Sequence, residues 1–376
     1  MKTAVTTLAA CVAALLALGL VMLYSASMTQ AGSRYLFFQL IWCALGLVLC
    51  VGATMLDYRW LKKIAWPAFA IALVLLVLVL LPLPFGITKR INGAHRWFIL
   101  PGMRLQPSEL GKLALIIALA WYGDRYQRFM HTWRRGILLP GVIGAVMIAP
   151  IFVEPDRGTT ALLACVCAAM LLIAGVQWKS FLPPIVLGVA AFAFAIWRDP
   201  MRMKRILSWM DVEGSKTGVG YQAYQAMLAL GSGGWTGLGL GNGRQKMGWV
   251  PEHHTDFIFS IIGEELGLVA TLLVVVAFVV FVICGVYISV RAPDPFGVLL
   301  GCGVTFLIGL QAFINIGVVT SALPNKGLPL PFISYGGSNL LAMFTCVGLL
   351  FSIARFSRPP AEAPESLNSS ELPQPA

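Results

Sequence analysis

The chain has 376 residues, of which 58% are hydrophobic and only 11% are charged, and its formal net charge is +11. A soluble domain carries about 25% charged residues, so this composition excludes a soluble globular protein. Continuous apolar runs of about 20 residues recur, each long enough to cross the hydrocarbon core of a membrane as a helix. Because the runs do not alternate with polar residues, a strand barrel is also excluded. We therefore expect an all-α polytopic integral membrane protein.

About ten segments are predicted to cross the membrane. Their ranges are 5–26, 36–55, 64–83, 107–122, 137–153, 158–176, 181–197, 256–290, 297–320 and 337–356. The first resembles a signal peptide, but its apolar run is longer than the usual h-region of about 7–15 residues. We interpret it as a membrane helix, with cleavage as the alternative. The eighth is too long for one straight crossing, so its C-terminal part is expected to extend beyond the bilayer or to tilt.

Short basic loops at 56–63 and 123–136 predict the orientation. The positive-inside rule assigns them, with both termini, to the cytoplasm. The expected organisation is one membrane domain at 1–358, with a large extracytoplasmic loop at about 198–255, and a disordered cytoplasmic tail at 359–376. The large loop is rich in glycine, but no nucleotide-binding fingerprint follows a strand there. No nucleic-acid partner is expected.

The segments predicted to lie outside also contain many cations, which is unusual for that side. Those that we single out are Arg90, Arg96, Arg244, Lys246 and Lys326. Guanidinium and ammonium groups bind phosphate oxygens well, so a lipid that carries a pyrophosphate would give these cations a role. A solvated loop that meets anionic headgroups is the alternative.

Ionisable residues at membrane segments are functional candidates because burying an unpaired charge in lipid is costly. Glu109 and Lys112 lie three residues apart at the start of the fourth segment and share a helix face. They form either a structural ion pair or an acid–base pair that lines a cavity. Asp156, in "EPDRGT", precedes the sixth segment, where it is expected to cap the helix, to line the cavity, or to do both.

A third acidic group opens the eighth segment, in "VPEHHTDFIFSIIGEELG". Thr255 is expected to cap this helix, which places Asp256 in its first turn. Glu264 lies about 80° from Asp256 around the helix, and Glu265 lies almost opposite. One face is therefore predicted to carry Asp256 and Glu264 into a polar cavity. A helix cap for Asp256 and helix–helix contacts for the glutamates are the alternatives.

A tight metal site is not expected. The histidines in this stretch match neither HExxH nor zinc-finger spacing, and the eight cysteines lie in apolar runs, as small buried side chains do. A divalent cation, Mg²⁺ or Mn²⁺, held loosely between a carboxylate and a phosphate, stays open. In "ALPNKGLPLPFISYGGSNL", at 322–340, prolines and glycines interrupt an apolar run, which is typical of an irregular segment that lines protein or water.

Four of these motifs resemble the SEDS family (shape, elongation, division and sporulation), the integral-membrane peptidoglycan polymerases. They are "VPEHHTDFIFSIIGEELG", "NKGLPLPFISYGGSNL", "INGAHRWFILPGMRLQPSELGK" and "EPDRGT". The resemblance extends over about 16–357 with the motifs in order. The wording of the first two is more similar to the division branch of the family than to the elongation branch, which is the near alternative.

The resemblance implies a glycosyltransferase of the bacterial cytoplasmic membrane. A glycan strand on undecaprenyl pyrophosphate would be transferred to the 4-hydroxyl of lipid II, with Asp256 at the position of the family's essential carboxylate. An aligned carboxylate can accept the hydroxyl proton as a general base. Glu109, Lys112 and Asp156 match positions that line the family's central cavity. A class B penicillin-binding protein, which is a transpeptidase, and other division proteins are the implied partners.

Two other functions remain open. Ten spans with buried charges also fit a lipid II flippase or transporter, whose sites lie near the membrane midplane. A scaffold that only recruits partners is the third hypothesis. The three differ in what loss of the Asp256 carboxylate does: it stops a polymerase, whereas a transporter or a scaffold tolerates it.

Overall fold

The computed structural model describes residues 1–27, 32–81, 88, 95–100, 103–211, 214, 216, 218–249 and 254–357. Arg90 and the predicted tail at 359–376 lie outside the described residues. The helices are α1 (Lys2–Ser27), α2 (Arg34–Met55), α3 (Leu61–Leu80), α4 (Pro107–Arg125), α5 (Leu139–Val153), α6 (Arg157–Ile173), α7 (Leu182–Trp197), α8 (Pro200–Met210), α9 (Tyr221–Gly233), α10 (Ile258–Val290), α11 (Pro295–Val319) and α12 (Gly337–Phe356). Two short strands, β1 (Phe98–Leu100) and β2 (Met103–Leu105), form an antiparallel hairpin before α4.

Helices overlap all ten segments that the sequence predicts, and the all-α membrane class is confirmed. Seven helices are long and apolar enough to span a membrane, and two shorter apolar ones lie at Arg157–Ile173 and Trp178–Ala191. The helix that matches the fourth predicted segment, α4, has 19 residues and carries two acids and two bases. Most of its side chains are buried, among them Glu109 and Lys112, whereas Asp124 and Arg125 at its C-terminal end are at least partly exposed. The number of ten crossings stays a prediction.

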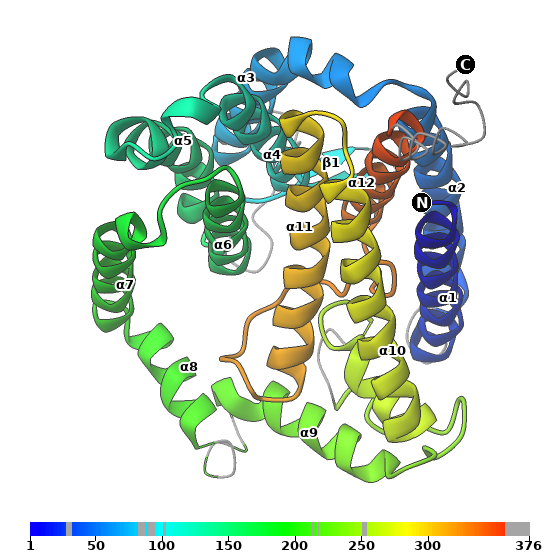
Figure 1. The fold of residues 1–376 in the computed structure, drawn as a ribbon. Coiled ribbons are helices and arrows are strands. Elements are labelled where there is room, and N and C mark those ends of the chain that lie inside the picture. Colours follow the sequence, from blue (N-terminus) through cyan, green and yellow to red (C-terminus); the bar gives the residue numbers. More distant parts are fainter. Residues whose placement is uncertain are drawn as a thin grey trace, which may run out of the picture.

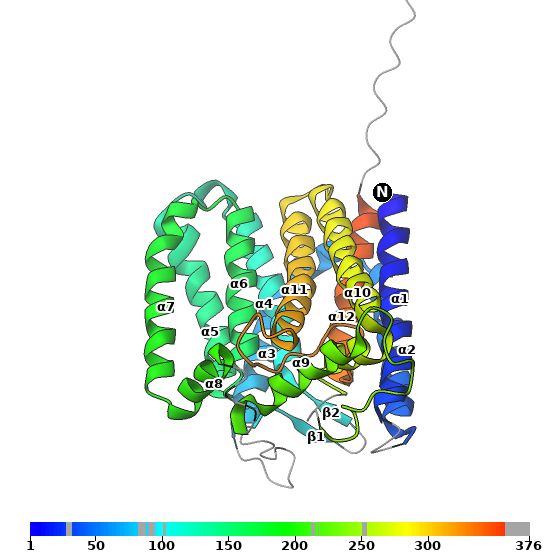
Figure 2. The ribbon, with the colours of Figure 1, turned by 90° about the horizontal axis from the view of Figure 1, so that it is seen from below.

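The two ends of the bundle differ in character. Figure 2 shows the N-terminus and the end of α12 at one end, and the hairpin β1–β2 with α8 and α9 at the other. The helix α7 lies at the edge of the molecule, away from α10 and α1 (Figure 1). The segment predicted as an extracytoplasmic loop, at 198–255, contains two helices, α8 and α9. The sequence analysis did not predict them, because the segment is rich in glycine.

The long helix α10 is broken at Gly267, whose backbone has φ 76° and ψ −173°. The sequence predicts that the C-terminal part of this segment extends beyond the bilayer or tilts. It does not predict the break that the structure shows at Gly267. The loop at 234–239 runs along the break and pairs with the groups that the helix leaves open. Its four hydrogen bonds are Leu238 N to Glu264 O (3.0 Å), Gly239 N to Glu265 O (3.0 Å), Leu268 N to Gly234 O (2.9 Å) and Val269 N to Trp235 O (3.3 Å). Open backbone groups within an apolar bundle are thereby satisfied.

Replacing Gly267 with alanine is expected to destabilise the protein. A Cβ at this position would lie 2.4 Å from Gly237 N and 2.5 Å from Trp235 O, and the positive φ disfavours any side chain. We expect a loss of at least about 1–3 kcal/mol, measured as a lower midpoint of thermal unfolding in detergent. Gly52→Ala in α2, where nothing lies within 4 Å, is the control and should be neutral or stabilising. Equal midpoints for the two variants would contradict the assignment of strain to Gly267.

Candidate active site

Asp256 lies in the turn that leads into α10. The expectation that Thr255 caps this helix, with Asp256 in its first turn, is wrong. The helix begins at Ile258, and its N-cap, Phe257, makes no side-chain cap hydrogen bond. Because Asp256 precedes the helix, the helical angle between it and Glu264 does not apply.

The main chain before α10 is engaged with other segments, which is why it does not continue the helix. Three consecutive carbonyl oxygens each accept a hydrogen bond from the last third of the chain. The bonds are Tyr335 N to His254 O (3.1 Å), Ser334 Oγ to Thr255 O (2.6 Å) and Asn315 Nδ2 to Asp256 O (2.8 Å). The residue that carries the carboxylate is therefore held by its backbone and by the two residues before it.

The carboxylate of Asp256 lies against the backbone of Gly327. A Cβ built on Gly327 would come within 2.0 Å of Asp256 Oδ2 and 3.0 Å of its Cγ. Gly327 is exposed and Asp256 is half-buried, so the contact lies where the protein meets its surroundings. The "NKGLPLP" motif thus passes directly beside the acid, although the two are far apart in the sequence.

Lys326, the neighbour of Gly327, covers the start of α6. Its Cγ and Cε lie 3.1 and 3.2 Å from the place of a Cβ on Gly158. Loss of solvation is the largest cause that lowers the pKa of Lys326, to about 8, and the nearby cations Arg96, Arg205 and Arg157 lower it further, against the opposing effect of Asp156. Four cations from four segments, Lys326 and the three arginines, thus lie near Gly327, whose backbone contacts the carboxylate of Asp256.

Asp156 caps α6, as the sequence predicts. Its carboxylate accepts hydrogen bonds from Thr159 N (3.2 Å) and Thr159 Oγ1 (2.9 Å). Glu154, two residues earlier, is a feature that the sequence analysis missed. It is only 1% exposed, and neither oxygen of its carboxylate has a hydrogen-bond partner. Desolvation and the nearby Asp156 raise the pKa of Glu154 to about 8, with Arg96 opposing.

Glu109 and Lys112 form the predicted ion pair, with 2.8 Å between Nζ and Oε2, and both side chains are almost fully buried. The pair belongs to a chain of polar contacts that joins three helices. Asn339 Nδ2 donates to Glu109 Oε2 (3.2 Å), and Lys112 Nζ donates to Gln311 Oε1 (3.0 Å). Gln311 Nε2 in turn donates to Pro329 O (2.9 Å). The pair therefore supports the segment that carries Gly327.

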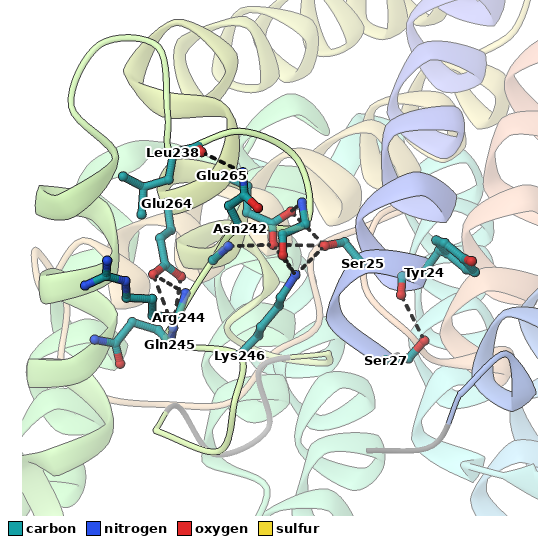
Figure 3. A network of polar contacts seen from close by, with 12 residues as sticks. Tyr24, Ser25, Ser27, Leu238, Asn242, Arg244, Gln245, Lys246, Glu264 and Glu265 are labelled. Carbon is teal, nitrogen blue, oxygen red and sulfur yellow. Dashed lines mark hydrogen bonds and ion pairs between the residues drawn. The ribbon is translucent and has the colours of Figure 1, made fainter. Parts of the chain in front are cut away.

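Glu264, Glu265 and Lys246 form a separate polar cluster, drawn in Figure 3. Glu264 accepts hydrogen bonds from the backbone of the glycine-rich loop, at Arg244 N (2.7 Å) and Gln245 N (3.2 Å). Glu265 pairs with Lys246 (2.7 Å) and accepts from Ser25 Oγ at the end of α1 (2.7 Å). Both glutamates are at most 1% exposed. This cluster holds the loop onto α10, and it leaves the carboxylate of Glu264 facing the loop.

The predicted residues thus divide into two sets. Asp256, Lys326, Asp156 and Arg96 belong to one neighbourhood, and Glu109 and Lys112 brace it from inside the bundle. Glu264 and Lys246 belong to the loop cluster, with Arg244, whose side chain is exposed. The sequence did not single out the amides of α11 and α12, because a buried Asn or Gln leaves no pattern in a single chain. Within the residues that the structure describes, no three metal-ligating side chains come together.

Comparison with known proteins identifies the family. Residues 6–359 match FtsW/RodA/SpoVE, described as cell cycle proteins. The chain belongs to this family. Two relatives bear the name probable peptidoglycan glycosyltransferase FtsW, from Geobacter metallireducens and Marinobacter nauticus, and each is 40% identical over 347 residues. The alignments cover 91% of this chain and 92% of the first relative, and 89% and 85% for the second. The resemblance noted in the motifs is confirmed.

Solved structures of the family share the fold. One, described as structural coordination of polymerization and crosslinking by a peptidoglycan synthase complex, matches with a TM-score of 0.79 at 28% identity, over 93% of this chain and 96% of that one. The rod shape determining protein RodA of Thermus thermophilus matches with a TM-score of 0.71 at 27% identity, over 94% and 97% of the two chains. This chain therefore shares its helical fold with both of these proteins.

Glu154→Gln is expected to change how stability depends on pH. The folded-state pKa of Glu154, about 8, lies above the ordinary value of 4.5, so the folded protein binds more protons than the unfolded chain between these values. Stability from this group is present at low pH and is lost as pH rises towards 8. The unfolding midpoint of the variant, relative to wild type, should therefore increase from pH 5 to pH 8. Asp211→Asn, at an exposed acid, is the control, and a constant difference for Glu154→Gln would refute the assignment.

Proposed function

We propose that this chain is a peptidoglycan glycosyltransferase that polymerises lipid II, with Asp256 as the general base. The proposal depends on one observation. The carboxylate of Asp256, just before the start of α10, lies against Gly327, and Lys326 directly precedes that glycine. The enzymatic class agrees with the names of the relatives, which are peptidoglycan glycosyltransferases. A half-buried acid at a surface, rather than a charge at mid-bundle, favours transfer chemistry over transport.

The proposed reaction forms one bond and breaks one bond. The 4-hydroxyl oxygen of lipid II attacks the anomeric carbon of the growing strand, and the bond from that carbon to the pyrophosphate of the lipid carrier breaks. The hydroxyl proton passes to the carboxylate of Asp256, and the electron pair leaves with undecaprenyl pyrophosphate. General-base catalysis of this kind contributes about 10²–10⁴-fold to the rate.

The cations beside Lys326 have a place in this reaction. Undecaprenyl pyrophosphate leaves with its negative charge, so it needs nearby positive charge more than it needs a proton. Lys326 and Arg96 are the proposed pyrophosphate contacts from the predicted set, and nearby Asp156 caps the start of α6. Glu109 and Lys112 are proposed to brace the cavity rather than to react. A divalent cation is not required by this scheme.

We propose an orientation with both termini in the cytoplasm and Asp256 at the outer face of the cytoplasmic membrane. The two basic segments predicted to be cytoplasmic, 56–63 and 123–136, lie close together, since Lys62 of the first pairs with Asp124 of the second at 3.0 Å. The N-terminus and the end of α12 lie at one end of the bundle, and the hairpin β1–β2 that leads into α4 lies at the other (Figure 2).

The proposed partners are a class B penicillin-binding protein and other proteins of cell division. The description of the peptidoglycan synthase complex links polymerization with crosslinking, and a crosslinking transpeptidase would use the new strand as its substrate. The FtsW names of the relatives support division rather than elongation as the setting.

Asp256→Asn is expected to abolish glycan polymerisation while leaving lipid II binding intact. The amide keeps the shape of the side chain but cannot accept the hydroxyl proton. The measurement is the size distribution of products from labelled lipid II, with purified protein free of other transglycosylases and with its partner present or absent. Polymerisation at the wild-type rate would refute the proposal, and headgroup translocation in liposomes that survives the substitution would favour a flippase.

Lys326→Arg is expected to extend activity to higher pH. The pKa of Lys326 is about 8, so the ammonium group loses its charge as pH rises through this value, whereas a guanidinium remains charged. Wild-type activity should fall above pH 8, and that of the variant should fall less. Lys326→Met, the uncharged control, should raise the KM for lipid II at pH 7, where the wild-type side chain is charged, and the difference should shrink above pH 8. If Lys326→Met has the wild-type KM at pH 7, Lys326 does not bind the pyrophosphate.

A further inference from the structure

One amide on α11 joins the two segments that meet at the catalytic carboxylate. Asn315 is 1% exposed, and its Nδ2 donates to Asp256 O (2.8 Å) and to Leu328 O (2.6 Å). An amide nitrogen carries two hydrogens, so each carbonyl receives one. The orientation of the amide is determined, because the flipped form would direct its oxygen at two carbonyl oxygens.

A second amide, one turn earlier on the same helix, extends this support. Gln311 and Asn315 are four residues apart and share a face of α11. Gln311 donates to Pro329 O (2.9 Å), directly after the Leu328 carbonyl that Asn315 holds. The backbone that follows Gly327 is therefore fixed at two consecutive carbonyls. Of these two amides, Asn315 is the one that also donates to the main chain of Asp256.

Space beside the carboxylate is the other half of the arrangement. The predicted position of a Cβ on Gly327 is 2.0 Å from Asp256 Oδ2, which is far inside van der Waals contact. The backbone of Gly327 is not in the positive-φ region, so the need for glycine here comes from this close approach alone. An alanine would adopt the same backbone but would displace the carboxylate.

We propose that Asn315 and Gly327 are positioning residues for Asp256. Asn315 fixes the main chain of Asp256 relative to the 327–329 segment, and Gly327 leaves the space that the carboxylate occupies. Neither residue gives or accepts a proton or forms a bond in the proposed reaction. The inference rests on the proposed function, since it assigns a role in the same reaction. A displacement of about 1 Å at a reacting group can lower a rate by about 10²-fold.

The first test is Gly327→Ala. We expect kcat for lipid II polymerisation to fall by about 10- to 100-fold, KM to stay within about two-fold of wild type, and the unfolding midpoint to stay unchanged. Gly52→Ala, at an open helical position, is the matched control. A kcat within two-fold of wild type would overturn the inference. An active Asp256→Asn variant would instead overturn the proposed function, so the two failures are distinguishable.

The second test is Asn315→Ala, measured alone and combined with Gly327→Ala. Both substitutions are expected to displace the same group, the carboxylate of Asp256. The combined loss of kcat should therefore be smaller than the product of the single losses. Asn242→Asp, at an exposed amide that also donates to a backbone carbonyl, is the control for loss of an amide donor. A lower unfolding midpoint with unchanged kcat per folded molecule, or fully multiplicative losses, would reduce Asn315 to a structural role.

Discussion

The structure depends on the pairing of main-chain carbonyls with polar side chains and amides from distant segments. A backbone group that leaves a helix inside an apolar bundle has no water to bind and must find a partner in the protein. The carbonyls of His254, Thr255 and Asp256 find theirs in Tyr335, Ser334 and Asn315. This requirement keeps the acid outside α10 and presents its carboxylate beside the "NKGLPLP" motif.

The same requirement explains the second irregular region. At Gly267 the helix α10 breaks, and the loop at 234–239 supplies the missing hydrogen bonds. The chain that follows this loop, at Arg244 and Lys246, is held by the carboxylates of Glu264 and Glu265. A glycine-rich segment thus becomes a fixed part of the fold, and the buried acids next to the break bind the backbone and Lys246 of that segment.

Much of this could be predicted from the sequence, because local patterns determine it. Apolar runs predict the helices, and spacing predicts the pair of Glu109 with Lys112. The cap at Asp156 is equally local. What could not be predicted depends on distance in space between residues far apart in the chain. The contact between Asp256 and Gly327, the pairing of Lys246 with Glu265 and the burial of Glu154 all arise from packing, and a helical-wheel estimate for Glu264 failed because the helix starts after Asp256.

Contacts between the two ends of the chain bear on how the protein assembles during synthesis. Ser25 at the end of α1 binds Glu265, 240 residues later, and Gln39 of α2 binds the backbone at Ser334, 295 residues later. A ribosome delivers the early helices to the membrane long before these partners exist. The first two helices are therefore made well before the residues that these two side chains bind in the complete fold. A chain that stopped before residue 265 would lack both partners, so the packing of α1 and α2 depends on completion of the C-terminal helices.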